Sequence, residues 1–258
     1  MMRIVSWNVN GVRAIAKKGF SQWLATEHPD VLCLQETKAS PDQLTEELTA
    51  PSGYHAYFSS AVKKGYSGVA IYSRQKPLDV TSLGVTRFDD EGRVLVAEYP
   101  GFTLITAYFP NSQDGGKRLD YKLDFCRTIH DYCNVITGRD RPLIVCGDFN
   151  VAHKPIDLAR PKENETSPGY LPEERAWMDQ FIDSGYVDTF RMFNADGGHY
   201  TWWSYFTKGR ERNIGWRIDY HCVNRPAAAM VRSAGILNTV MGSDHCPVDV
   251  VIDADPTR

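Results

Sequence analysis

The segment Leu143-Ile144-Val145-Cys146-Gly147-Asp148-Phe149-Asn150 constrains the fold more than any other stretch of the chain. It is a short apolar run that follows Pro142 and ends in polar loop residues, which is typical of a buried strand. Residues two apart on an extended chain face the same side, so we expect Asp148 and Asn150 to face one solvent-accessible spot while Phe149 turns into the core. A carboxylate and an amide held there can polarise and orient a water molecule. The alternative is an ordinary Asp/Asn turn without chemistry.

The chain is long enough to enclose such a strand in a core. Its 258 residues are 42% hydrophobic and 24% charged, and we expect residues 1–258 to form one domain. The net charge of -3 means that any attraction to a polyanion must be local. Six cysteines without a CxxC pair indicate buried thiols in a reducing compartment. A strand follows Met1 almost at once and no apolar run approaches about 18 residues, so we expect a cytoplasmic protein with no leader and no membrane partner.

Periodicity and turn residues predict the other elements. We expect strands over 3–7, 31–35, 55–59, 69–73, 93–99, 102–109, 202–205, 216–223, 234–237 and 248–252. We expect helices over 12–28 with an interruption at Gly19, over about 117–137 and over 173–184, and a helix start at Ser40. Many strands with few interposed helices predict an α/β (α+β) protein in which packed sheets are flanked by helices.

Several of these strands end on polar residues that a core does not need. These residues are Asn8, Glu36, Tyr108, Asp148, Asn150, Asp219, Asp244 and His245. Each also has an ordinary explanation: Glu36 can pair with Lys38, Asp219 can pair with Arg217, and the others suit turns. A sheet whose strands finish at one edge would bring these residues together, and such edges are where sites tend to be built.

This set of side chains suits one kind of chemistry. Carboxylates and amides without a Cys/His cluster favour a hard cation such as Mg²⁺, with Glu36 as its natural ligand. A histidine oriented by an aspartate, here His245 with Asp219, can hold a phosphoryl oxygen or transfer a proton. If Asp148 holds a water molecule on the side opposite the leaving group, the metal, the histidine and this water together fit in-line attack on a phosphodiester.

Six motifs in register carry a family resemblance. They are Ser6-Trp7-Asn8-Val9-Asn10-Gly11-Val12-Arg13, Cys33-Leu34-Gln35-Glu36-Thr37-Lys38, Lys64-Gly65-Tyr66-Ser67-Gly68-Val69-Ala70, Gly147-Asp148-Phe149-Asn150, Trp216-Arg217-Ile218-Asp219-Tyr220 and Ser243-Asp244-His245. From residue 3 to about residue 252 the chain resembles the exonuclease III type of apurinic/apyrimidinic endonuclease, within the endonuclease/exonuclease/phosphatase superfamily. The resemblance implies a four-layer α/β sandwich with two mainly antiparallel sheets. It also implies Mg²⁺-dependent cleavage, with Mn²⁺ as a substitute, on the 5′ side of an abasic site to leave a 3′-hydroxyl.

Carried over position by position, the resemblance implies groups of site residues. The metal group is Glu36, Asn8 and Asp244. The group that activates the water and orients the scissile phosphate is Asp148, Asn150, His245, Asp219 and Tyr108. One departure bears on the metal group, because Asn10 stands where some relatives carry an aspartate.

Selection of the substrate is expected in the loops. Residues 200–217 interleave aromatic side chains with lysine and arginine, which suits a phosphate backbone with an apolar group inserted or enclosed. The alternative is that the tryptophans are core residues. By resemblance, the walls of a pocket for a flipped-out abasic sugar are Trp202, Trp216 and Ile218. The residues expected to contact DNA are Asn111, Asn164, Lys64, Tyr66, Phe206 and Arg217, with Phe206 pushed into the duplex.

The leading hypothesis is a monomeric DNA-repair endonuclease that acts on double-stranded DNA with abasic sites. Side activities as a 3′→5′ exonuclease and 3′-phosphodiesterase stay open, and the unadorned core is typical of a bacterial or archaeal protein with access to the nucleoid. A lipid or inositol phosphate phosphodiesterase or phosphatase is a second hypothesis, which the basic, tryptophan-rich loop disfavours. A catalytically silent DNA-binding module is a third, which the intact set of polar residues disfavours.

Overall fold

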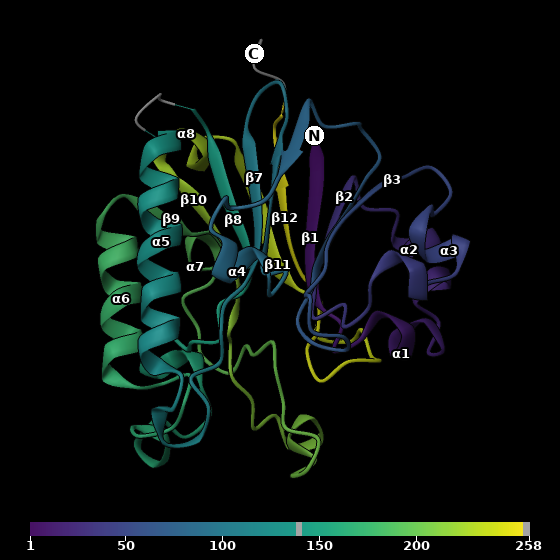
Figure 1. Ribbon diagram of the computed structural model, residues 1–258. Coiled ribbons are helices and arrows are strands. Elements are labelled where there is room, and N and C mark those ends of the chain that lie inside the picture. Colours follow the sequence, from purple (N-terminus) through teal and green to yellow (C-terminus); the bar gives the residue numbers. More distant parts are fainter. Residues whose placement is uncertain (138–140, 255–258) are drawn as a thin grey trace.

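Two six-stranded β-sheets lie face to face at the centre of the computed structural model, which describes residues 1–137 and 141–254 (Figure 1). The first sheet consists, in spatial order, of β11 (Val231–Ile236), β12 (Val248–Ile252), β1 (Met2–Asn8), β2 (Val31–Gln35), β4 (Val69–Ser73) and β3 (His55–Ser59). The second consists of β5 (Asp79–Thr81), β6 (Val94–Glu98), β7 (Thr103–Tyr108), β8 (Leu143–Asp148), β10 (Asp219–Asn224) and β9 (Tyr186–Asp188). Only β1–β2 and β7–β8 are parallel among these pairs. The predicted sandwich of two mainly antiparallel sheets is confirmed.

Both faces of the central strands are covered, and this explains their continuous apolar runs. In β8, Ile144 and Cys146 pack between the two sheets, while Leu143 and Val145 pack against the outer helices. Successive side chains of a strand point to opposite faces, so a strand buried on both faces has no polar position to spare. A polar residue at the end of such a strand therefore marks a place where the core stops.

Helices cover the outer face of each sheet and complete the four layers (Figure 1). The first sheet is covered by α1 (Val12–Ala16), α2 (Phe20–Glu27) and α3 (Glu46–Thr49). The second is covered by α4 (Thr86–Asp89), α5 (Leu119–Thr137) and α6 (Pro172–Asp183), and two short helices, α7 (Thr189–Phe193) and α8 (Arg225–Ala228), adjoin its strands. Within residues 1–137 and 141–254, no helix combines the length and the apolar character needed to span a membrane.

The structure agrees with most of the predicted elements and corrects several. The strands at 31–35, 55–59, 69–73 and 248–252 have the predicted bounds, and the first helical region breaks at Gly19, where φ is +88°.

The predicted strand at 202–205 is wrong, because Trp202 forms only isolated bridges with Trp216 and His245. The predicted strand at 216–223 begins only at Asp219. Ser40 precedes a single 3-10 turn over 41–43 rather than an α-helix. The short elements β5, β9, α3, α4, α7 and α8 were not predicted, since they hold too few residues for a periodic pattern.

Candidate active site

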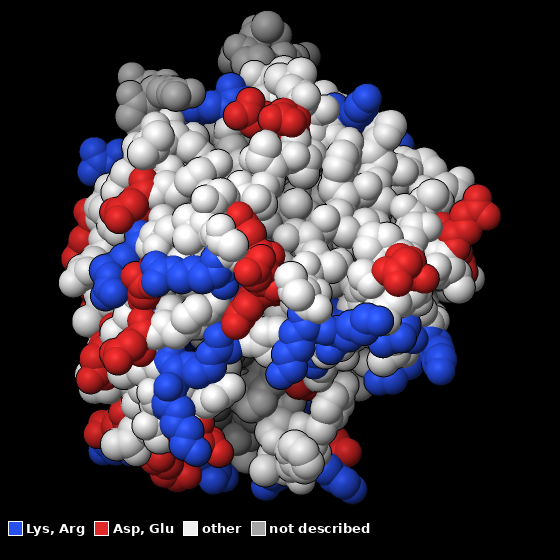
Figure 2. All heavy atoms as spheres, in the orientation of Figure 1, with Lys and Arg blue, Asp and Glu red and all other residues white. Residues whose placement is uncertain are grey.

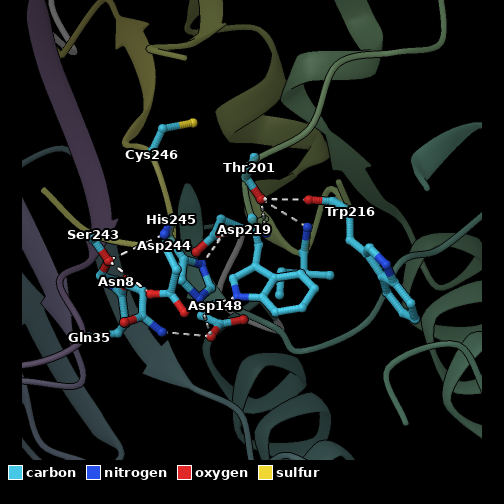
Figure 3. Close-up of polar contacts among 12 residues, drawn as sticks. Asn8, Gln35, Asp148, Thr201, Trp216, Asp219, Ser243, Asp244, His245 and Cys246 are labelled. Carbon is cyan, nitrogen blue, oxygen red and sulfur yellow. Dashed lines mark hydrogen bonds and ion pairs between the residues drawn. The ribbon is translucent and has the colours of Figure 1, made fainter. Parts of the chain in front are cut away.

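The predicted site residues meet at one end of the sandwich, where strands of both sheets end (Figure 3). In the second sheet, Asp148 is paired in register with Tyr108 of β7 and with Asp219 of β10. From the first sheet, Asn8 Nδ2 donates to Asp148 Oδ2 at 2.8 Å and to Glu36 Oε1 at 2.9 Å. Since Asn8 is fully buried, one amide group ties the two sheets and two carboxylates together.

The segment from Asp148 to Asn150 forms a turn that brings both side chains to one place. Asp148 Oδ1 accepts from the Asn150 backbone N–H at 2.8 Å, and Asn150 has a φ of +51°. The Asn150 side chain donates to the Phe109 carbonyl at 3.0 Å and accepts from Asn111 Nδ2 at 3.1 Å. Phe149 between them is buried in the core. The turn alternative is therefore present in the structure, and it is this turn that aims the carboxylate and the amide.

His245 is held by Asp219. Its Nδ1 lies 2.9 Å from Asp219 Oδ2, and its Nε2 lies 3.9 Å from Asp148 Oδ2 (Figure 3). Thr201 Oγ1 accepts from the Asp219 backbone N–H at 3.2 Å, which fixes the start of β10. Asp219 therefore orients the imidazole, and it does not pair with Arg217 as the alternative proposed.

Asp244 connects this centre to an aromatic wall. Its Oδ2 accepts from Trp202 Nε1 at 3.1 Å, and its Oδ1 accepts from Asn10 Nδ2 at 2.9 Å. Asn10 Oδ1 in turn accepts from Lys38 Nζ at 2.6 Å. The amide at position 10 thus bridges a carboxylate and an ammonium group, which an aspartate could not do with its acceptor-only side chain.

Four carboxylates, of which Asp148 and Asp219 are buried, outnumber the two cations paired with them among the described residues, Lys38 and His245. We call this group the cleft cluster; its members are Glu36, Asp148, Asp219, Asp244 and His245. Burial and then the charge of Asp219 raise the pKa of Asp148 to about 7. Burial alone would lower the pKa of His245, but the charge and hydrogen bond of Asp219 together with the charges of Asp148 and Asp244 raise that pKa to about 10. Burial alone would raise the pKa of Glu36, but the charge of Lys38 together with hydrogen bonds from Asn8 and Lys38 keeps it below its ordinary value.

The cleft cluster fits a metal ion. Glu36, Asp148 and His245 each offer one ligand atom, and these atoms lie within 4.8 Å of one another. Lys38 Nζ lies 2.7 Å from Glu36 Oε2, so one counter-charge is already beside the predicted ligand. Asn8 is less suited to direct ligation, because its Oδ1 already accepts from the Asn10 backbone N–H at 3.0 Å. Oxygen donors crowded in this way suit a hard divalent cation.

A cleft of about 620 Å³ opens beside the cleft cluster. Trp202 and Trp216 line it with their ring planes at 88° and their centroids 6.3 Å apart, and Ile218 lines it as well. Both tryptophans are partly exposed, whereas Trp203 next to them is buried in the core. Tyr108 also lines the cleft; burial and then the charge of Glu36 raise its pKa, so its hydroxyl stays protonated. Figure 2 shows the surface hollowed at this end of the molecule, with Lys and Arg side chains near the rim.

Comparison with known proteins agrees with this geometry. The profile of the Endonuclease/Exonuclease/phosphatase family matches residues 5–245, from β1 to the histidine of the cleft cluster. The chain belongs to this family. It is 44% identical over 255 residues to an exodeoxyribonuclease of Bacillus subtilis, and the alignment covers 98% of this chain and 100% of that protein. It is 43% identical over 255 residues to the DNA repair nuclease APEX1 of Danio rerio, covering 97% of this chain and 82% of that protein. An AP endonuclease from Archaeoglobus fulgidus has a similar structure, with a TM-score of 0.89, 30% identity, and coverage of 98% of this chain and 100% of that one.

Loops around the cleft of this endonuclease/exonuclease/phosphatase family chain carry most of the residues expected to contact DNA. Asn111 and Asn164 line the cleft, and Lys64 is exposed. Phe206 is fully exposed at the tip of its loop, where an aromatic side chain gains nothing from the core. The Tyr66 hydroxyl accepts from two arginine side chains, so its polar end is already bonded within the protein.

The prediction that Arg217 contacts DNA is wrong. Arg217 is 1% exposed, and its guanidinium donates to Asp157 Oδ1 at 2.8 Å and to Asp188 Oδ2 at 2.7 Å. Arg191 Nη2 donates to the same Asp157 oxygen at 2.6 Å. We call Asp157, Asp188, Arg191 and Arg217 the anchor cluster. Since Arg217 lies between Trp216 and Ile218 in the chain, the anchor cluster holds the segment that carries two walls of the cleft.

A second buried ion pair was missed by sequence reasoning. Lys122 and Glu174 are both about 1% exposed, and Lys122 Nζ lies 2.7 Å from Glu174 Oε1. Lys122 Nζ also donates to the Asn150 carbonyl at 2.5 Å, while Glu174 Oε2 accepts from the Gly169 backbone N–H at 2.7 Å. The pair therefore ties α5 and α6 to two loops that line the cleft. A signal was present, because each residue interrupts the apolar stripe of its helix with a charge.

Proposed function

We propose that the chain is an apurinic/apyrimidinic endonuclease of DNA repair, which hydrolyses the phosphodiester on the 5′ side of an abasic site and leaves a 3′-hydroxyl. One observation carries the proposal: the cleft cluster, whose four carboxylates are paired with two cations among the described residues, opens directly into a cleft with an aromatic wall. The relatives support it, since they are named exodeoxyribonuclease and DNA repair nuclease. Family membership alone is compatible with other phosphate esters, so the choice of DNA depends on the cleft.

The geometry supports a division of labour in the hydrolysis. Asp148 steers the attacking water and accepts its proton, because a carboxyl with a pKa of about 7 is a suitable base near neutral pH. Asn8 and the Asn150 backbone each hold one oxygen of that carboxylate in place. His245, held protonated by Asp219, donates to a phosphoryl oxygen as negative charge develops there.

The remaining polar groups of the cleft suit the scissile phosphate. Tyr108 offers a protonated hydroxyl, and Asn111 and Asn150 offer amide groups fixed by their mutual hydrogen bond of 3.1 Å. Donors fixed before the substrate arrives cost no reorganisation in the transition state. We propose these groups as the phosphate contacts.

We propose Mg²⁺ as the cofactor, with Glu36 as its main ligand and Mn²⁺ as a substitute. The support is the Glu36 carboxylate next to that of Asp148; the nearest atoms of Glu36, Asp148 and His245 lie within 4.8 Å of one another, and the protonated His245 serves there as a donor to the phosphate and not as a ligand. Asp244 contributes negative charge nearby, although its two oxygens already accept from Asn10 and Trp202. When bound, the metal would neutralise charge on the phosphate and on the leaving oxygen.

Selection for abasic duplex DNA is proposed to reside in the slot formed by Trp202, Trp216 and Ile218. A sugar without its base is cheap to extrude, because little stacking or pairing is lost, and a narrow apolar slot excludes an intact nucleotide. The fully exposed Phe206 suits insertion into the duplex at the position that the extruded sugar leaves empty. Asn164, which lines the same cleft, and the exposed Lys64 suit the DNA phosphates.

Two further proposals concern the state of the protein. All the residues of the proposed site come from one chain, which supports action as a monomer. All six cysteines are buried and unpaired, which supports a reducing compartment such as the cytoplasm, with access to the nucleoid.

A panel of end-labelled duplexes tests the proposal. The duplexes carry an abasic analogue, a 3′-phosphate, uracil or no lesion, and each is incubated with the full chain in Mg²⁺ or in EDTA. We expect nicking 5′ to the abasic analogue in Mg²⁺ alone, and none by Asp148→Asn. Asp131→Asn, a change of an exposed aspartate on α5, is the matched control and should nick like the wild type.

Other outcomes of the same panel would replace the proposal. Equal cleavage of the undamaged duplex would remove the abasic specificity. Turnover of inositol phosphates without any DNA cleavage would favour a phosphatase. Binding of abasic duplex without nicking in Mg²⁺ or Mn²⁺ would favour a silent DNA-binding module. The 3′-phosphate and undamaged arms also measure the 3′-phosphodiesterase and exonuclease side activities.

A further inference from the structure

A small cavity, separate from the cleft, borders Asp219. It lies among β10, β11, β12 and α7, and its lining includes Arg217, Asp219, His221 and Ile236. Arg217, Asp219 and His221 are each at most 3% exposed, and Thr189, Tyr220 and Asp249 also line the cavity. The cavity leaves about 10 Å³ for the centre of a water molecule. One water needs about 10–15 Å³ on this measure, so the space matches a single molecule.

Three buried polar atoms on this lining have no hydrogen-bond partner within the described protein. They are Arg217 Nη1, Asp219 Oδ1 and His221 Nε2. The same side chains are otherwise bonded: Arg217 uses Nε and Nη2 on aspartates, and Asp219 uses Oδ2 on His245. Residues 217, 219 and 221 alternate along an extended segment, which places them on one side of it. Buried polar atoms without a protein partner are typically satisfied by an internal water.

The chemistry of the three atoms selects the ligand. Arg217 Nη1 is a donor, Asp219 Oδ1 is an acceptor, and an imidazole nitrogen can be either. The carboxylates of Asp219 and Asp249 would repel an anion, Arg217 would repel a cation, and the space is too small for an organic molecule. Water both donates and accepts, and three partners is the usual number for a buried water.

We propose that this cavity binds one water molecule, which accepts from Arg217, donates to Asp219 and is completed by His221, and that Arg217 and His221 thereby act as positioning residues for the Asp219–His245 pair. With Oδ1 held by this water, the plane of the Asp219 carboxylate is fixed, and its Oδ2 keeps His245 in the orientation seen in Figure 3. Without it, the terminal torsion of Asp219 is broad and the imidazole loses a rigid support. The water also joins the anchor cluster to the cleft cluster through Arg217.

The water site is tested by crystallography of the full chain, and its positioning role by kinetics that rest on the proposed endonuclease function. Three variants separate the causes: His221→Leu removes one polar ligand, His221→Gln keeps a polar atom at similar reach, and Ile236→Val removes a methyl group from the same lining without removing a polar atom. Each is assayed on abasic duplex in Mg²⁺, with kcat and KM measured separately.

We expect one ordered solvent peak within hydrogen-bond distance of Arg217 Nη1 and Asp219 Oδ1 in the wild type. We expect His221→Leu to lower kcat about 10-fold with KM unchanged, as for other groups that orient a catalytic side chain. His221→Gln and Ile236→Val should keep the wild-type kcat. The split between kcat and KM distinguishes positioning from a general loss of folded protein, which circular dichroism monitors.

An empty cavity, or a protein atom bonded to Arg217 Nη1 in the crystal, would overturn the water site. An unchanged kcat in His221→Leu, or an equal loss in Ile236→Val, would overturn the positioning role. If the wild type does not nick abasic duplex at all, the proposed endonuclease function fails, and the crystallographic result still decides the water site independently.

Discussion

Two clusters of carboxylates, the anchor cluster and the cleft cluster, each contain buried aspartates, and they differ in how their charge is balanced. In the anchor cluster, Asp157 and Asp188 face the guanidinium groups of Arg217 and Arg191. Burial alone would raise the pKa of Asp157, but the charge of Arg217 together with hydrogen bonds from Arg217 and Arg191 lowers that pKa. The same residue type therefore becomes a stable anion when the protein supplies an arginine.

The cleft cluster adjoins the anchor cluster at Asp219, two residues after Arg217, and it lacks this balance. Its four carboxylates share His245 and a lysine, Lys38, whose side chain is 34% exposed. The pKa of Asp148 is raised to about 7 by burial and then by the charge of Asp219. Burial is thus common to both clusters, and the supply of counter-charge separates them. A balanced cluster holds structure, whereas an unbalanced cluster beside a cleft is suited to a cation and a phosphate.

The largest expected difference between the cleft cluster and the anchor cluster is in catalysis. Asp148→Asn should lower kcat for nicking of abasic duplex by about 10²–10⁴-fold, since it removes the proposed base. Its free energy of unfolding at pH 7 should be unchanged or higher, because one of several crowded carboxylates is neutralised. Single-turnover nicking and urea unfolding measure the two quantities. A fully active Asp148→Asn protein, or one destabilised by several kcal/mol, would break the distinction between the clusters.

The anchor cluster should respond in the opposite way. Arg217→Met should lower the free energy of unfolding by about 3–5 kcal/mol, because it leaves Asp157 and Asp188 buried without their main partner. Adding Asp157→Asn to that variant should recover part of the loss, and urea denaturation measures both. If Arg217→Met instead kept its stability and lost affinity for intact duplex DNA, the rejected role of Arg217 as a DNA contact would return.

The two clusters also show where sequence reasoning succeeds and where it stops. The ends of β2, β4 and β8 were predicted because both faces of these strands are buried and each run ends abruptly at a polar residue. The convergence of Asn8 and Glu36 followed from neighbouring strand ends sharing one edge of a sheet, whereas Asp148 lies on the second sheet and reaches Asn8 because the two sheets pack face to face. These features are local, or they repeat along the chain.

The ion-pair partners of Asp219 and Arg217 were not predictable from the sequence in the same way. Asp219 could pair with Arg217 two residues away or with His245 at a separation of 26, and only the sheet register and the turn before β12 decide between them. Arg217 looked like a DNA contact because basic and aromatic residues surround it, yet Asp157 and Asp188 come from distant loops and strands. A buried arginine and an exposed one have the same sequence signal, so burial had to come from the fold.

The pH dependence of stability should have opposite signs at the two aspartates. The lowered pKa of Asp157 gives stability that is present above its unfolded value of about 3.9 and is lost as the pH falls. The raised pKa of Asp148 means that its ionisation costs stability as the pH rises from about 4 towards 7, by up to about 1.4 kcal/mol per unit. His245 does not interfere below pH 6.5, since its raised pKa takes effect between its ordinary value and about 10.

Urea unfolding in EDTA between pH 4.5 and 6.5 isolates these effects. Relative to the wild type, Asp148→Asn should gain stability steadily across this window. Asp157→Asn should stay destabilised throughout, with the deficit shrinking only below about pH 4. Parallel curves for the two variants would show that the clusters do not differ in charge balance.

Metal binding should stabilise the folded chain through the cleft cluster alone. At about 100 times its dissociation constant, Mg²⁺ should raise the free energy of unfolding by about 2.7 kcal/mol. Glu36→Gln should lose most of this gain, because it removes the proposed main ligand, whereas Asp157→Asn should keep it. Thermal unfolding in EDTA and in Mg²⁺ compares the three proteins, and an undiminished gain in Glu36→Gln would move the metal away from that residue.

The smallest effect is expected at Lys38, which is the one lysine among the described residues that pairs with a carboxylate of the cleft cluster. Its ammonium lies 2.7 Å from Glu36 Oε2 and 2.6 Å from Asn10 Oδ1, so distance alone would rank this contact with those of Arg217. Its side chain is partly exposed, however, and ion pairs in contact with water contribute about 0–1 kcal/mol. Lys38→Met should therefore change the free energy of unfolding by less than about 1 kcal/mol, measured by urea denaturation beside Arg217→Met. A loss as large as that of Arg217→Met would mean that the cleft cluster is balanced by the protein itself, and the case for a bound cation would lose its electrostatic basis.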